Sequence, residues 1–123
     1  MKTRKLHHLT NEQLVERFAT IALQQDDALH NDNTAKFNRL YGQMDDVTSE
    51  LMLRPGDQRR LLLPLYDHPN VQVQLKAATR TLAVMPEEAR VTLERIAASR
   101  KFPQAGDAGM LLAGLDDKSF TPK

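Results

Sequence analysis

The sequence predicts an all-helical protein built from stacked helix pairs, and three observations lead to this prediction. Apolar residues recur at the i, i+3, i+4, i+7 spacing of a buried helix face along most of the chain. One such face repeats 31 residues later in the same register, as expected for stacked repeats. No segment alternates with period two for long enough to form a strand. The repeated faces are Leu40, Met44, Val47 and Leu51, and then Val71, Leu75, Ala78 and Leu82.

The first half of the chain predicts two helices. Thr10 and Gln13 have the spacing of a capping box, so a first helix begins after Thr10 and runs to about His30. The polar stretch 30–33 ends it, because Asn and Asp side chains favour turns. A second helix follows, and the clearest break in the chain, residues 54–57 (Arg-Pro-Gly-Asp), comes after it.

A proline affects the form of the third predicted helix, and a capping residue marks the start of the fourth. A third helix over about residues 58–66 contains Pro64, which removes a backbone hydrogen bond, so this helix is kinked or split into two short pieces. Asn70 is placed to cap a fourth helix. The apolar face of the fourth helix extends to Met85.

The fifth and sixth predicted helices differ in how strongly their sequences favour a helix. Pro86 is favourable at a first helical position, so a fifth helix begins there and runs to about Ser99. A sixth helix covers about residues 105–115 and contains three glycines, so it depends on packing. We expect six helices in three pairs, forming one domain over residues 1–123, with a loose arm at residues 1–9 and a polar tail at 116–123.

Composition limits the possible functions. The chain has 41% hydrophobic and 27% charged residues and a net charge of +1, so it has no general affinity for polyanions. It has no cysteine, which excludes disulfides, zinc–thiolate sites and cysteine nucleophiles. No apolar run approaches the ~20 residues of a membrane span. We therefore expect a soluble protein of the cytoplasm.

Residues 61–82 resemble a HEAT-type helical repeat. In such repeats a helix with a kinking proline is followed by a turn with Asp and Pro, and then by a helix with a Val, paired alanines and a late leucine. Gln74 stands where the repeat commonly has Arg. The resemblance implies a right-handed αα-superhelix, and the whole chain also resembles small uncharacterised bacterial proteins with HEAT-like folds. The matching residues are Pro64, Asp67, Pro69, Val73, Ala77, Ala78 and Leu82.

No group of residues predicts catalysis, a metal or a cofactor. His7 and His8 are adjacent and have no partner at helical spacing that would complete a metal site. The paired acids lie on helix exteriors or in the tail, whereas catalytic carboxylates need a cleft. Basic residues of the fifth helix alternate with Glu87, Glu88 and Glu94, which neutralise a possible nucleic-acid stripe. We therefore expect a protein that is not an enzyme.

The 31-residue register predicts which residues face outward on the second helix of each pair, which lines the concave face of a HEAT-like stack. The row through Asp45, Lys76 and Asp107 is acidic, basic and acidic. This row either forms salt bridges between repeats, which the stacking alone would favour, or belongs to a mixed groove that binds a protein segment. The outward positions are Tyr41, Asp45 and Ser49, then Gln72, Lys76 and Arg80, then Pro103, Asp107 and Leu111.

The leading functional hypothesis is a non-enzymatic protein-interaction module, such as an adaptor or an immunity-type binder. Its expected contact residues are Tyr41, Asp45, Gln72, Lys76, Arg80 and Asp107. The alternative is a nucleic-acid-binding or base-modifying protein, against which the net charge of +1 argues. The weak last helix exposes apolar residues such as Met110, so the protein is expected to be a monomer or an end-to-end homodimer.

Overall fold

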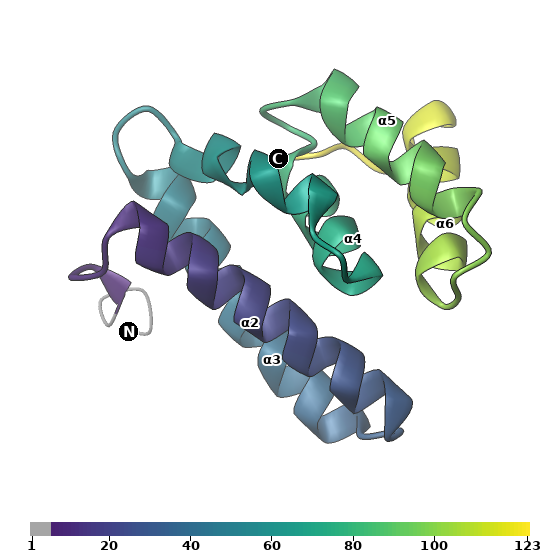
Figure 1. The fold of residues 1–123 in the computed structure, drawn as a ribbon. Coiled ribbons are helices and arrows are strands. Elements are labelled where there is room, and N and C mark those ends of the chain that lie inside the picture. Colours follow the sequence, from purple (N-terminus) through teal and green to yellow (C-terminus); the bar gives the residue numbers. More distant parts are fainter. Residues whose placement is uncertain (1–5) are drawn as a thin grey trace. The chain divides into compact units, whose positions relative to one another are not determined.

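The computed structural model describes residues 6–123, which are largely helical and contain no strand (Figure 1). The prediction of an all-helical protein is confirmed. The chain divides into two compact units, residues 1–61 and 62–123, which are described in turn. None of the helices in residues 6–123 is long and apolar enough to span a membrane. The helices are α2 (Asn11–His30), α3 (Thr34–Leu53), the 3-10 helix η1 (Gln58–Asp67), α4 (Val71–Thr81), α5 (Pro86–Ala97) and α6 (Gln104–Asp116).

The first unit is a hairpin of α2 and α3, which lie side by side (Figure 1). The predicted capping box is present: the Thr10 hydroxyl accepts from the backbone N–H of Gln13 at 3.1 Å, and the side-chain Oε1 of Gln13 accepts from the backbone N–H of Thr10 at 2.9 Å. Asn33 caps α3 by accepting from the N–H of Lys36. The apolar stripes predicted for both helices supply the buried side chains between them. These include Leu14, Phe18, Ile21, Leu40, Met44, Val47 and Leu51.

Arg54 ties the segment before α2 to the end of α3. Its guanidinium donates to Glu50 Oε2 at 2.9 Å and to Asn11 Oδ1 at 2.8 Å. It also donates to the carbonyl oxygens of Leu6 at 3.2 Å and Leu9 at 2.7 Å. Leu6 is buried. These hydrogen bonds hold residues 6–9 in place. A loose arm was predicted for residues 1–9, and the prediction is wrong for residues 6–9. Residues 1–5 lie outside the described part of the chain.

Residues 58–67 form a 3-10 helix and not the kinked or divided helix that was predicted. The reason is Pro64 within it, which has no N–H to donate and which clashes with the preceding turn of an α-helix. The boundary between the two units falls inside η1, after Leu61.

The second unit contains the rest of η1 and helices α4 to α6. Asn70 caps α4 as predicted, because its side-chain oxygen accepts from the N–H groups of Gln72 and Val73. However, α4 ends at Thr81 and does not extend to Met85. Proline disfavours helical backbone in the residue before it, so Met85, which precedes Pro86, stays outside α4 and is the N-cap of α5.

Helix α6 packs against both α5 and α4. Its inner face is made of small residues, Ala105 and Ala108, which let the neighbouring helices approach closely. The predicted polar tail folds back at its start, where the N–H of Phe120 donates to the carbonyl oxygen of Gly114 at 3.1 Å. A Cβ at Gly114 would lie 3.2 Å from the Cβ of Phe120, so a larger residue here would push the returning chain outward by a few tenths of an ångström.

Replacing Arg54 should destabilise the first unit. Arg54→Ala leaves Glu50, whose side chain is 7% exposed, without its cation, and should lower the free energy of unfolding by about 3 kcal/mol. Urea denaturation measures this change, and faster hydrogen exchange around residues 9–14 should accompany it. The control Arg60→Ala removes an exposed guanidinium and should change stability by less than about 0.5 kcal/mol. Equal effects of the two substitutions would contradict the role assigned to Arg54.

Candidate functional site

The residues predicted for the concave contact surface are distributed over both units. In the first unit, Tyr41 is 45% exposed and Asp45 is also exposed. In the second unit, Asp107 is exposed, whereas Lys76 and Arg80 are partly buried. The row that would join the two units stays a prediction. The six predicted residues are Tyr41 and Asp45 on α3, Gln72, Lys76 and Arg80 on α4, and Asp107 on α6.

Gln72 is a structural residue and not an exposed contact residue as predicted. Its side chain is 1% exposed, and its Oε1 accepts a hydrogen bond of 3.0 Å from Nε2 of Gln104, which is also buried. The 31-residue register places Pro103 beside Gln72, and it is the next residue, Gln104, that contacts it. The 31-residue register therefore predicted which segment lies beside Gln72. It did not predict that Gln72 is buried, because α6 covers the start of α4.

Side chains of the other candidate groups lie close to oppositely charged partners. Over residues 6–123, no three His, Asp or Glu side chains gather as they would around a metal ion. His7 lies 3.8 Å from Glu50, whose carboxylate is already bound by Arg54. Of the paired acids, Asp116 forms an ion pair of 2.9 Å with Arg90. These contacts are typical of structural ion pairs.

A groove in the second unit is the strongest candidate for a functional site. It runs between the latter part of η1 and α5 and has a volume of about 610 Å³. Leu63 on η1 is 42% exposed, and Val91 on α5 is 65% exposed. Buried Tyr66 and Thr92 form its floor. Two apolar walls thus remain open to a partner after the helices of this unit have packed.

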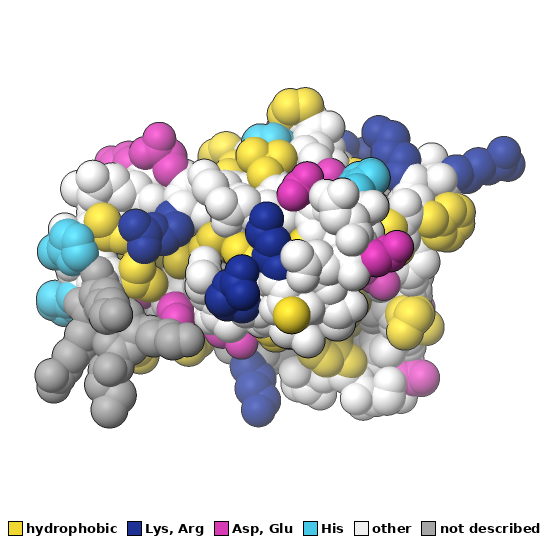
Figure 2. Space-filling model, turned by 90° about the horizontal axis from the view of Figure 1, so that it is seen from below, with side chains coloured by type: hydrophobic (Ala, Val, Ile, Leu, Met, Phe, Trp, Pro, Cys, Tyr) yellow, Lys and Arg dark blue, Asp and Glu magenta, His cyan; other side chains and the backbone are white. Residues whose placement is uncertain are grey.

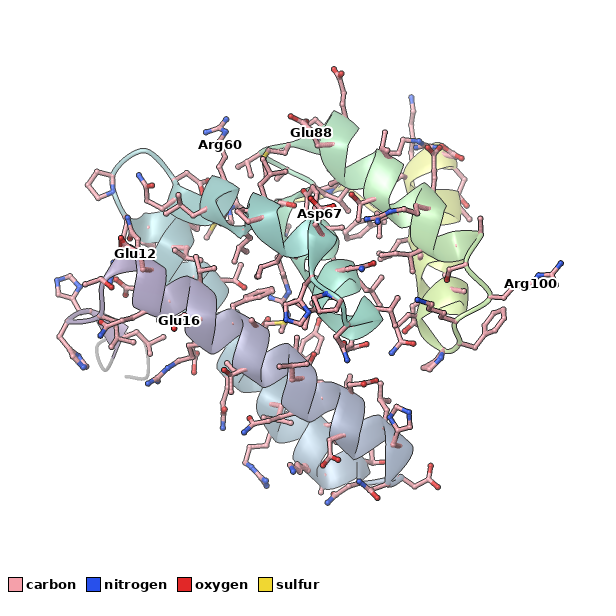
Figure 3. The ribbon with its side chains drawn as sticks, in the orientation of Figure 1. Glu12, Glu16, Arg60, Asp67, Glu88 and Arg100 are labelled. Carbon is pink, nitrogen blue, oxygen red and sulfur yellow. The ribbon has the colours of Figure 1, made fainter. Side chains whose placement is uncertain are left out.

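Charged side chains border this groove. Asp67 ends η1 and Glu88 lies in the first turn of α5, and both carboxylates are exposed (Figure 3). Arg95 also lines the groove, but one of its guanidinium nitrogens donates to the carbonyl oxygen of Tyr66 at 2.9 Å. The groove therefore carries two carboxylates and one cation that is held against its floor.

The floor of the groove is fixed by Tyr66. Its hydroxyl forms a short hydrogen bond with the hydroxyl of Thr81, which in turn donates to the carbonyl oxygen of Ala77. Burial raises the pKa of Tyr66 above its usual value of 10.0, the hydrogen bond with Thr81 opposes this rise, and the negative charge of Glu88 adds to it. Tyr66 therefore stays neutral at physiological pH, and Glu88 makes this part of the groove electronegative.

Two apolar residues of this groove could have been noticed in the sequence, because they lie outside the buried stripes of their helices. In the run Leu61 to Leu65, the i, i+3 pair Leu62 and Leu65 is buried, as the repeat predicts. Leu63 falls off this stripe, and Val91 likewise falls off the stripe of Leu93 on α5. Apolar residues outside a buried stripe are candidates for an exposed contact surface.

Comparison with known proteins identifies the family. Residues 12–116 match the family described as Domain of unknown function (DUF2019), so the chain belongs to this family. Its structure is similar to the crystal structure of the protein RPA1889 from Rhodopseudomonas palustris CGA009, with a TM-score of 0.94 and 52% sequence identity. The similarity covers 96% of this chain and 98% of that one. A search of curated proteins gave no match.

The structural role of Gln72 can be tested with a double-mutant cycle. Gln72→Leu leaves the Gln104 amide without the acceptor shown here and should cost about 1–3 kcal/mol of stability. Replacing both glutamines with leucine should cost less than the sum of the two single changes, because neither side-chain amide is then left at this contact without the other. Chemical denaturation of the four proteins measures the coupling. Strictly additive effects would show that the two side chains act independently.

Proposed function

We propose that the protein is a non-enzymatic protein-interaction module with a HEAT-like arrangement of its helix pairs. The observation that carries this proposal is the groove between η1 and α5, in which Leu63 and Val91 keep 42% and 65% of their surfaces exposed. Contiguous exposed apolar side chains with a charged border are typical of protein contact surfaces. The 31-residue repetition of helix faces supports the HEAT-like arrangement.

The groove favours a particular chemistry in its partner. An apolar side chain placed between Leu63 and Val91 would remove both from water, at about 25 cal/mol for each Å² of apolar surface buried. Lys or Arg beside this anchor would lie near Asp67 and Glu88. Such opposite charges at the rim of an interface contribute mainly to specificity and to the association rate. The proposed partner therefore presents a short segment with an apolar residue next to a basic one.

A protein partner is better supported than a nucleic acid. A phosphate backbone requires a concentration of positive charge, whereas Asp67 and Glu88 repel it from this groove. On the face drawn in Figure 2, basic, acidic and hydrophobic side chains are interspersed. The net charge of +1 agrees with this distribution.

Selection from a random peptide library tests the proposal. The full chain should enrich peptides that combine an apolar with a basic residue. Val91→Glu should weaken binding of a selected peptide at least about tenfold, because it places a charge against the apolar anchor. Glu88→Lys should shift the selection toward acidic peptides.

The control for this selection is Leu53→Glu, which changes an apolar residue that is 73% exposed and lies outside the groove. It should leave peptide affinity unchanged, and circular dichroism should show that all variants are folded. Failure to enrich any sequence class, or equal loss of binding in Leu53→Glu and Val91→Glu, would contradict the assignment of function to this groove.

A further inference from the structure

Helix α6 exposes a second apolar surface in the same unit. Phe102, just before the helix, is 71% exposed, and Met110 near its middle is 75% exposed. The opposite side of the helix carries the buried Ala105 and Ala108. A helix that is apolar on both sides is typical of an element packed between two neighbours, and α6 has α4 and α5 on one side only.

The exposed side of α6 has the shape of a surface for another helix. Within α6, Gly106, Gly109 and Ala113 have the i, i+3, i+7 spacing of one helix face, and Phe102 precedes the helix. The Phe102 ring lies 3.8 Å from the position of a Cβ on Gly106, so it packs over that glycine. No atom lies within 4 Å of a Cβ on Gly109. Gly109 is therefore open to a partner, Met110 projects beside it, and the Phe102 ring lies at one end of this face.

The charges at the two ends of α6 indicate which helix would fit. Arg100 and Lys101 precede the helix and Asp107 lies in its first turn, so the beginning of α6 has a net charge of +1. At its end, Asp116 and Asp117 lie near Glu94, and the neighbouring cations are Arg90 and Lys118. Three acids and two bases leave this end net negative. The surface thus has opposite charges at its two ends.

We propose that two copies of the chain associate through antiparallel α6 helices. In a two-fold contact the same surface meets itself in reverse, so the positive beginning of each helix faces the negative end of the other. The Phe102 ring lies over Gly106, three residues before Gly109. A contact centred on Gly109 therefore places each Phe102 ring near Leu112 and Ala113 of the other helix.

Sedimentation equilibrium of the full chain over a range of concentrations tests this proposal. The protein should show a monomer–dimer equilibrium, and Met110→Lys should weaken association at least about tenfold while the circular dichroism spectrum is unchanged. Val91→Glu lies outside α6 and should leave association unchanged. A monomer at every soluble concentration, or a dimer as strong in Met110→Lys as in the wild type, would overturn the proposal.

A pair of charge-reversed variants provides a second test, in which association is expected to be restored when the two variants are mixed. Arg100→Glu with Lys101→Glu makes the beginning of α6 negative, and Asp116→Lys with Asp117→Lys makes its end positive. Each variant alone should dimerise more weakly, because like charges then meet at both ends of the contact. An equimolar mixture should form a heterodimer, since opposite charges meet again. If the folded variants do not associate more strongly when mixed than alone, the antiparallel arrangement is wrong.

Discussion

Helices α2, α3, α4 and α5 each have one apolar face, and a helix with one apolar face requires a neighbour that covers it. This constraint determines the organisation of both units. In the first unit the stripes of α2 and α3 cover each other, with Phe18 and Met44 fully buried. In the second unit α5 packs against α4 and α6. The functional surfaces proposed above are the places where apolar side chains remain exposed after this pairing is complete.

Hydrogen bonds between polar groups then determine the relative positions of the helices within each unit, which apolar contacts alone do not determine. Arg54 connects the end of α3 with the segment before α2, and the hydrogen bond between Gln72 and Gln104 connects α4 with α6. Tyr66 and Thr81 do the same between η1 and the end of α4. An unpaired buried polar group costs more than a mispacked methyl group, so these contacts select one helix arrangement among several of similar apolar area.

The sequence predicted most of what depends on local chemistry. The caps at Thr10 and Asn70 and the start of α5 at Pro86 follow from short-range rules, and the structure confirms them. The burial of Gln72 depends on how deeply α6 packs against α4, which helical spacing does not determine. The groove between η1 and α5 was not predicted, because its apolar residues come from two helices and from outside their buried stripes.

We propose that the groove between η1 and α5 binds a segment of a protein partner. Amide chemical shifts of the full chain, recorded while a selected peptide is added, test this claim most directly. We expect the largest changes in residues 63–67 and 88–95, the segments that line the groove. Changes confined to other helices, or spread evenly over the chain, would contradict it.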